Sequence, residues 1–382
     1  MDGLPRGPGV GHHGRMPPRD PYLSTISRGT VHGTLLRARH LHDAAHDPSS
    51  GPQGSDSAFD PPRITTAVRG RTRLLAELTA AMDSGTPVPH VLAGPGGSGT
   101  STVAAALAER ARADGWRVFW TRAGEVPVGQ QLDHSPEPWL LVLDGTDRPE
   151  ALAPYRPRSG PGGFVLVTSR VQDPAVWDPA QMHEVAELDS AAAGAALADH
   201  AGEEALPGAE ELAERLGGIP LALTLAGRIL ASHRVLFPDA RALCKRLDED
   251  GLEPPDTGSE PCQGRGLLSG IWDVALDLAS RREPKAPALL RLLAVLGSDG
   301  VPVPLRRLDP GFLRGEPLPL SDRPELARAV NALVVHGLVS VHEDGDAIDL
   351  WLHPLVSETL CAQHERCAPF HELAERIVAG QH

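Results

Sequence analysis

Residues 89–111, PHVLAGPGGSGTSTVAAALAERA, decide the fold of this 382-residue chain. An apolar run over 90–93 meets a glycine-rich loop over 94–99, and a helical pattern follows with Val103, Leu107 and Ala111 on one face. Strand, glycine loop and helix in this order are typical of a phosphate-binding loop, because glycines let consecutive N–H groups turn towards a phosphate and the helix N-terminus adds a positive dipole. The predicted binding residues are Gly94, Gly96, Gly97, Ser98, Gly99, Thr100, Ser101 and Thr102.

One position departs from the usual pattern of such loops, G-x-x-x-x-G-K-[ST]. Gly94, Gly99 and Ser101 match it, but Thr100 stands where lysine is usual. The lysine bridges the β- and γ-phosphates as a point charge, whereas threonine is shorter and uncharged. A hydrogen bond to a charged group contributes about 1.5–3 kcal/mol, so the loss of two would weaken nucleotide binding about 10²–10⁴-fold. We expect a phosphate cradle without its main positive charge.

Length and composition indicate two or three globular domains. The apolar fraction is 41%, and no apolar run approaches the ~20 residues that span a membrane. The start of the sequence lacks a signal-peptide core, and the four cysteines form no C-x-x-C pair, so we expect a cytoplasmic protein without a zinc site or a disulfide framework. The net charge of −14 argues against nonspecific binding to nucleic acids and to membranes.

Apolar runs after the loop predict the rest of a parallel sheet, with strands over 116–121, 139–144, 163–170 and, more briefly, 185–188. Residues 139–144 read WLLVLD, an apolar strand that ends in an acid and resembles a Walker B motif. Asp144 would hold Mg²⁺ through water, with Ser101 as the second metal-binding residue. A buried strand that ends in Asp at a turn is the alternative, and the upstream phosphate loop favours the metal site. Arg170 ends the fourth strand, where polar residues face the ligand crevice of a parallel sheet.

The remaining periodicity is helical. Residues 1–60 are rich in Gly and Pro and predict a largely disordered tail, with one candidate strand at 29–36. Helices are expected over 71–82, 191–200, 210–216, 221–233, 240–247, 267–279, 286–296, 324–337, 354–363 and 369–378, and a hairpin over 338–342 and 347–352. Two helices followed by a hairpin suggest a winged helix. We therefore expect a P-loop α/β domain over 61–190, a helical domain with a linker over 191–284, and a winged-helix domain with C-terminal helices over 285–382.

Together these motifs resemble the NB-ARC branch of the STAND NTPases, which are regulatory switches that exchange ADP for ATP and couple the exchange to domain rearrangement. The resemblance covers about residues 64–365. Six motifs carry it in the family's order: V-x-G-R at 68–71, the phosphate loop, the Walker B strand, T-S-R at 168–170, G-I-P-L-A-L at 218–223 and L-H-P-L-V at 352–356. The resemblance implies a P-loop NTPase parallel sheet flanked by helices, and ADP or ATP with Mg²⁺ as the cofactor.

The resemblance also implies roles for four further residues. Pro220 would pack on the nucleobase, Arg170 would sense the γ-phosphate, His353 would touch the β-phosphate of ADP, and Arg71 would belong to the same nucleotide site. Taken alone, His353 fits a satisfied structural histidine better than a ligand-binding one. Besides Thr100, the chain departs from the family at Gly145, where a second acid usually follows the Walker B acid. A catalytic base is then missing unless Asp147 substitutes for it. Arg69 stands where an apolar residue is usual, and neither an effector domain nor sensor repeats are expected within the chain.

Four functions follow as hypotheses. The first is a nucleotide-responsive switch that binds ADP or ATP weakly and hydrolyses little or none, with an unknown protein partner supplying sensor or effector. The second is a pseudo-NTPase platform for partner proteins that binds no nucleotide. An active ATPase is opposed by Thr100 and Gly145. A winged-helix DNA-binding regulator is opposed by the helix over 324–337, which carries only Arg328 beside Glu325. The first is favoured narrowly over the second.

Overall fold

The computed structural model describes residues 64–122, 132–249, 263–297, 301–344, 347–361 and 364–379. The expected disordered tail, the candidate strand at 29–36 and most of the linker ahead of residue 263 lie outside these residues. Within the described part, no helix is both long enough and apolar enough to cross a membrane.

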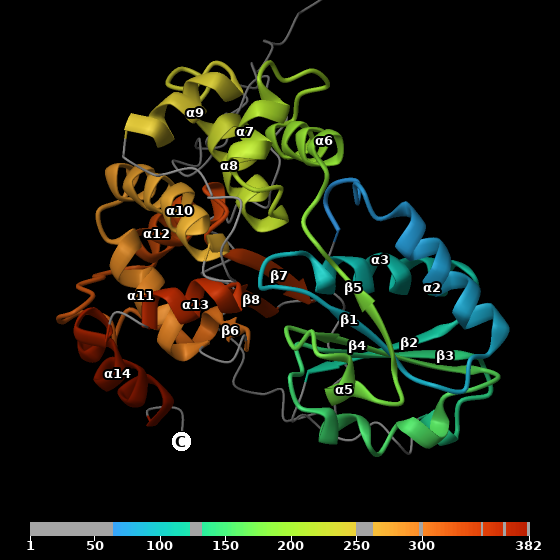
Figure 1. Ribbon diagram of the computed structural model, residues 1–382. Helices are drawn as coiled ribbons and strands as arrows, with labels where there is room; N and C mark the ends of the chain where they lie inside the picture. Colours follow the sequence, from blue (N-terminus) through green and yellow to red (C-terminus); the bar gives the residue numbers. More distant parts are fainter. Residues whose placement is uncertain are drawn as a thin grey trace, which may run out of the picture. The chain divides into compact units, whose positions relative to one another are not determined.

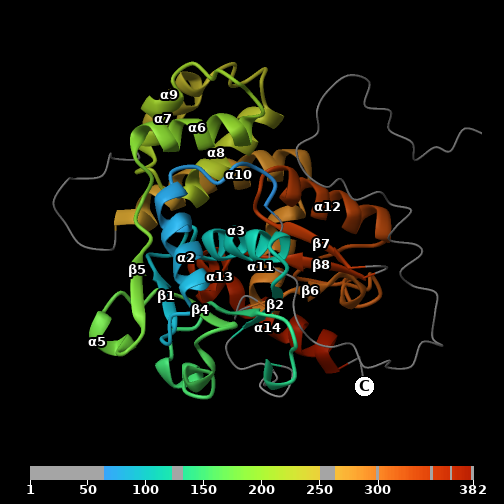
Figure 2. The ribbon, with the colours of Figure 1, turned by 90° about the vertical axis from the view of Figure 1, so that its right-hand side faces the viewer.

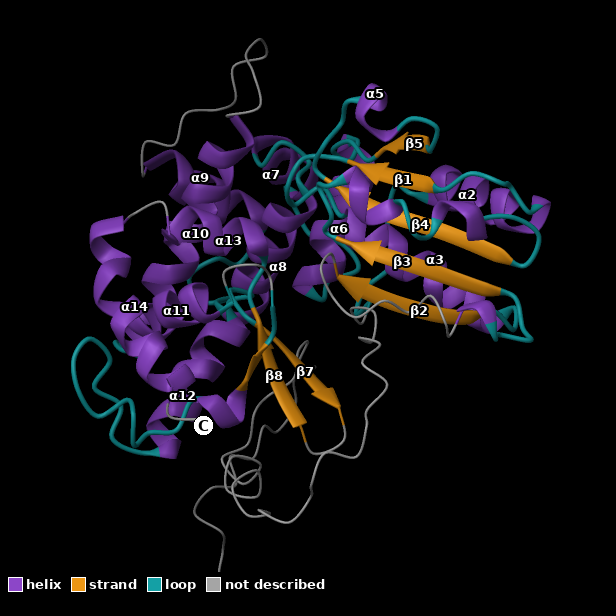
Figure 3. Cartoon of the chain, turned by 90° about the horizontal axis from the view of Figure 1, so that it is seen from below, coloured by secondary structure: helices purple, strands orange, loops and turns teal. Residues whose placement is uncertain are grey.

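Five parallel strands form the larger sheet, in the order β2-β3-β4-β1-β5 (Figures 1 and 3). They are β1 (His90–Ala93), β2 (Arg117–Arg122), β3 (Trp139–Asp144), β4 (Gly163–Ser169) and β5 (Gln181–Glu184). The three central strands are buried on both faces, which explains their continuous apolar sequences. Because β4 pairs with both β1 and β3, the carboxyl ends of the P-loop strand and the Walker B strand meet beside the end of β4.

Helices cover both faces of this sheet (Figure 1). On one face, α2 (Thr72–Ser84) and the alanine-rich α3 (Thr100–Ala113) enclose an apolar core cluster that contains Leu78, Leu107 and Leu166. On the other face, α5 (Pro174–Trp177) and the 3-10 turns η1 (Pro149–Leu152) and η2 (Arg156–Arg158) enclose a second cluster around Trp177. A parallel sheet flanked by helices, with a glycine loop between β1 and α3, is the P-loop NTPase fold, and it confirms the predicted fold class.

The prediction of a strand over 185–188 is wrong, because the fifth strand is Gln181–Glu184. It is an edge strand with two exposed and two half-exposed residues, so its sequence, QMHE, has no apolar run. Val185 is fully buried, which explains its apolar character, and its N–H still donates to the Ala93 carbonyl at 2.7 Å. The ladder of β-sheet pairs ends just before this residue.

The rest of the described chain is mostly helical. It comprises α6 (Ser190–Ala201), α7 (Ala209–Arg215), α8 (Pro220–Ser232), α9 (Ala240–Glu249), α10 (Gln263–Arg282), α11 (Ala286–Leu296), α12 (Arg323–Val335), α13 (Pro354–Cys361) and α14 (His364–Ala379). Helices α6 to α9 pack against one another (Figures 1 and 2). All the predicted helices are present, with shifted ends. The largest shift is at α14, which begins five residues early and contains Pro369.

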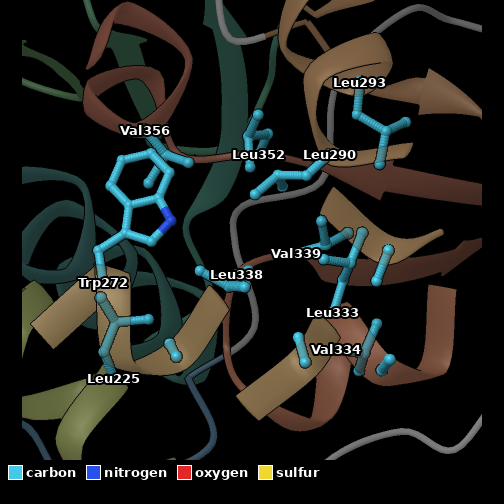
Figure 4. Packing of buried hydrophobic residues seen from close by; sticks show 14 of the residues in the cluster. Leu225, Trp272, Leu290, Leu293, Leu333, Val334, Leu338, Val339, Leu352 and Val356 are labelled. Atoms are coloured by element: carbon cyan, nitrogen blue, oxygen red, sulfur yellow. The ribbon is translucent and has the colours of Figure 1, made fainter. Parts of the chain in front are cut away.

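A small antiparallel sheet follows α11. Its strands β6 (Val303–Pro304), β7 (Ser340–Asp344) and β8 (Ala347–Trp351) lie in the order β6-β8-β7, with the 3-10 turn η3 (Leu305–Arg307) after β6. The hairpin of β7 and β8 was predicted, whereas β6 is too short to leave a pattern in the sequence. A third apolar core cluster runs through this region from Ala193 in α6 to Ile377 in α14. Figure 4 shows part of it, where Trp272 of α10 lies between Leu225 of α8 and Val356 of α13.

Candidate phosphate-binding site

The glycine loop leaves β1 at Gly94, whose N–H donates to the Ser169 carbonyl at 3.1 Å. A Cβ atom at Gly94 would lie 2.4 Å from the Val185 oxygen and 2.6 Å from the Ser98 Oγ, so only glycine fits there. Gly97 and Gly99 have φ angles of 84° and 92°, a region that side chains rarely adopt. The loop can therefore take this path only with glycine at these positions.

Several polar groups of the loop are left without a partner. The N–H groups of Gly96, Gly97, Gly99, Thr100 and Ser101 donate no hydrogen bond to another described residue. The Ser98 hydroxyl is also unpaired, although Ser98 is only 2% exposed. Unpaired N–H groups at the start of α3, together with the positive end of the helix dipole, are the donor set that an anion such as phosphate requires. The residues present thus fit a phosphate group.

Asp144, at the end of β3, lies in a small network of oxygen atoms. The Ser101 Oγ donates to its Oδ1 atom at 2.7 Å, and the Thr168 Oγ1 donates to the same atom at 2.6 Å. The Thr168 hydroxyl in turn accepts the N–H of Gly145 at 2.7 Å. One carboxylate with nearby hydroxyls suits Mg²⁺ that also binds phosphate oxygens and water. Among the described residues, no group of three or more His, Cys, Asp or Glu side chains could hold a metal without such help.

Asp147 accepts several hydrogen bonds from residues at the carboxyl end of β4. It accepts from the Ser169 Oγ at 2.9 Å, from the Arg170 backbone N–H at 2.9 Å, and from the Arg170 guanidinium at 2.9 and 3.0 Å. Burial alone would raise the pKa of Asp147, but these hydrogen bonds and the charge of Arg170 outweigh burial and hold the pKa below its ordinary value. A carboxylate of low pKa that is already hydrogen-bonded is a weak general base.

Arg170 and Arg71 also bond to other protein groups near the loop. Arg170 donates its Nη1 to the Glu358 carboxylate in α13, so its guanidinium lies between two acids. Arg71 donates to the Ser98 carbonyl at 3.2 Å and to the Ala186 carbonyl, and it thereby ties the loop to the chain that follows β5. Glu358 was not predicted as a site residue, because α13 comes 188 residues after Arg170 in sequence.

Residues from far along the chain cover the loop. The Leu221 N–H donates to the Gly97 carbonyl at 3.2 Å, and Pro220 lies 3.8 Å from the position of a Cβ on Gly99. On the other side, the Leu355 side chain lies 3.5 Å from the position of a Cβ on Gly96. The start of α8 and the start of α13 thus meet at the same loop.

His353 precedes this contact and is half-buried. Burial, followed by the charge of Arg170, lowers the pKa of His353 to about 4, so its ring is neutral at pH 7. Its Nδ1 accepts the Leu355 N–H at 3.2 Å, which leaves the proton of the neutral ring on Nε2 as a donor. Thr100 is the first residue of α3 and is half-buried, whereas Thr102 is exposed. Of the predicted site residues outside the loop, Asp144 bonds Ser101, Pro220 lies against Gly99, and Arg71 is directed at carbonyl groups.

No protein-family model matches this chain, and no curated protein matches it. A STAND protein with a tetratricopeptide-repeat sensor from Pyrococcus horikoshii aligns with a TM-score of 0.47 and 15% identity, over 78% of this chain and 43% of that one. The Aeropyrum pernix ORC2 protein, solved as ADPNP–ADP complexes, aligns with a TM-score of 0.30 and 16% identity, over 85% and 97% of the two chains. The chain thus spans less than half the length of the first of these structures.

Proposed function

We propose that this chain is a nucleotide-responsive regulatory switch of the NB-ARC type, which binds ADP or ATP weakly and hydrolyses ATP little or not at all. The observation that carries the proposal is a row of loop N–H groups without a partner among the described residues, those of Gly96, Gly97, Gly99, Thr100 and Ser101. Unpaired N–H groups at the start of a helix bind anions, and the buried Ser98 hydroxyl beside them also has no partner among the described residues. The oxygen network of Ser101, Asp144 and Thr168 stands next to this row, where the phosphates would bring Mg²⁺.

In this proposal each residue of the site has a defined part. The loop N–H groups bind the phosphates, and Ser101 and Asp144 hold Mg²⁺, which neutralises phosphate charge when it is bound. The Nε2 proton of neutral His353 is available to the β-phosphate, and Pro220 packs on the nucleobase. Arg170 responds to a γ-phosphate, while Arg71 supports the loop through the Ser98 carbonyl. The P-loop domain over 61–190 would then signal to the helical domain over 191–284 and the winged-helix domain over 285–382.

Slow hydrolysis is part of the proposal. Thr100 brings no charge to the phosphates, and Gly145 leaves the position after Asp144 without a carboxylate. The substitute base, Asp147, is occupied by Ser169 and Arg170. The loop therefore lacks the positive charge that would speed phosphoryl transfer, and the substitute base is already hydrogen-bonded.

A partner platform that binds no nucleotide is the second candidate. It is favoured by the contacts of Leu221 and Leu355 with the loop, since they cover Gly97 and Gly96 with apolar side chains. In that case the folded chain would bind a protein partner, and the loop would no longer bind nucleotide.

Nucleotide extraction distinguishes the two candidates. Purified protein should release ADP when it is denatured and chromatographed, and calorimetric titration of the stripped protein with ADP and Mg²⁺ should give a measurable affinity. Asp144→Ala should weaken this affinity, because it removes the acid at the metal position. Asp133→Asn is the matched control, since Asp133 pairs with Arg158 on an exposed surface away from the loop. Binding that is absent, or that is unchanged in Asp144→Ala, would favour the partner platform.

A further inference from the structure

The guanidinium of Arg170 connects two acids of very different attachment. Asp147 accepts from the Arg170 backbone N–H, from its side chain and from the Ser169 hydroxyl. Glu358 accepts only from Nη1 of Arg170, makes no other hydrogen bond with a described residue, and keeps 39% of its side chain exposed. Asp147 is therefore held by groups at the carboxyl end of β4, whereas Glu358 is held by Nη1 of Arg170 alone among the described residues.

Arg170 stands next to the loop because of the strand order. It follows β4, and β4 pairs with β1, whose end leads into the loop. The Gly94 N–H donates to the carbonyl of Ser169, the residue before Arg170, at 3.1 Å. In α13, Glu358 lies three residues after Leu355, which covers Gly96. Positions three apart share one face of a helix, so a single face of α13 meets both the loop and Arg170.

We propose that Glu358 determines which nucleotide the site accepts: its carboxylate occupies Arg170, so that a nucleoside diphosphate fits and a triphosphate binds only when its terminal phosphate replaces Glu358 on the guanidinium. The inference rests on the proposed function. A terminal phosphate and a carboxylate are both anions that accept hydrogen bonds from the Arg170 guanidinium, and they repel each other when both lie against it. Glu358 gives way rather than Asp147, since Glu358 has no second partner among the described residues.

The replacement links the third phosphate to α13. Release of Glu358 removes an ion pair that joins α13 to the P-loop sheet, next to the Leu355 contact. Triphosphate binding and the docking of α13 on the loop are thermodynamically linked. The docking of α13 lowers the affinity for triphosphate by the same factor by which bound triphosphate lowers the equilibrium constant for docking. The switch would in this way distinguish ATP from ADP through a residue outside the P-loop domain.

The test compares two nucleotides in one set of variants. Calorimetry with Mg²⁺ would measure ADP and the non-hydrolysable β,γ-imido analogue of ATP on the full chain, as wild type and as Glu358→Gln. Freeing an exposed arginine from one carboxylate should strengthen binding of the analogue about fivefold and change ADP affinity less than about twofold. Asp133→Asn, which frees Arg158 in another exposed pair, should change neither affinity. In an Arg170→Gln background, Glu358→Gln should have no effect on the analogue.

Each outcome has a distinct meaning. If ADP binds normally but the two affinities keep their ratio in Glu358→Gln, the role of Glu358 is overturned and the switch proposal stands. A gain for the analogue that persists without the Arg170 guanidinium would also overturn it, since the effect would then come from net charge alone. If neither nucleotide binds to the wild type or to any folded variant, the proposed function itself fails, and this inference fails with it.

Discussion

Thr100 is the residue at which the proposed site departs most from a standard phosphate loop. It begins α3, beside N–H groups that have no partner among the described residues. Thr100→Lys would place a positive charge where the phosphates bind, and we expect it to tighten ADP binding at least about tenfold, or about 1.4 kcal/mol. Calorimetric titration of both proteins with ADP and Mg²⁺ measures the change. Thermal stability in saturating ADP should rise with it, because a ligand that binds the native state stabilises that state.

A variant of similar length without charge, Thr100→Gln, controls for side-chain size and should gain much less affinity. Hydrolysis should stay slow in Thr100→Lys, because Gly145 still supplies no base. A lysine variant that folds normally and binds ADP no more tightly than the wild type would show that the loop has ceased to be a nucleotide site. The partner platform would then become the first hypothesis.

Sequence identifies the residues of the loop better than the residues that reach it. Gly94, Ser101 and Asp144 belong to local motifs with fixed spacing, so they could be named without a structure. The bridge from Thr168 to Asp144 depends on β4 lying next to β3, and strand order cannot be read from apolar runs. The pairing of Arg170 with Glu358 depends on the packing of α13, which no local pattern encodes.

The glycine loop is the element whose backbone is most constrained. Gly94→Ala would place a Cβ 2.4 Å from the Val185 oxygen, and we expect the variant to lose about 3 kcal/mol of unfolding free energy through overpacking. Gly145→Ala is the matched control, because Gly145 also follows a central strand but has nothing within 4 Å of its Cβ position. Its φ of 68° should cost roughly 1 kcal/mol. Urea unfolding of the two variants, analysed with a common slope, tests the order. Equal losses would contradict the role of the Val185 contact.

Among the strands of the parallel sheet, the buried ones were predicted correctly and the exposed edge strand β5 was not. Strands β1, β3 and β4 have apolar side chains on both faces and therefore stand out in the sequence. Strand β5 lies at the sheet edge and is partly exposed, so its sequence is polar and does not have the apolar pattern of a strand. The apolar Val185 is buried just after it, and the strand was therefore predicted to begin at Val185. Pro369 suggested a later start for α14, because proline is tolerated in the first turn of a helix and disfavoured further in.

The whole molecule should be sensitive to mild acid. His90 and His336 are fully buried, and burial lowers the pKa of each to about 4. Unfolding returns each ring to a pKa near 6.5, so between pH 6.5 and pH 4 the unfolded state binds more protons. Stability should therefore fall with falling pH in this window, by at most about 1.4 kcal/mol per pH unit for each of these histidines. Urea unfolding at pH 7.5, 6.0 and 5.0 measures the slope.

His90→Phe tests the source of this slope. Phenylalanine keeps a ring against Phe164, on which His90 stacks at 4.7 Å, and it cannot take up a proton. It loses the hydrogen bond between the His90 Nδ1 and the His183 Nε2, so the variant should be less stable at pH 7.5 but less dependent on pH. An unchanged slope between pH 6.5 and pH 5 would mean that His90 does not carry the acid sensitivity.

The three separate apolar core clusters have a consequence for how the chain melts. Two lie on the faces of the parallel sheet, and the third fills the helical remainder from α6 to α14. The polar contacts between these regions include the pairs Arg69–Asp199 and Arg170–Glu358, and exposed ion pairs of this kind contribute about 0–1 kcal/mol each. We therefore expect the sheet and the helical remainder to unfold as separate cooperative units with weak thermodynamic coupling. A small molecule that contacts the loop, α8 and α13 at once would couple the two units, so that they unfold in a single transition.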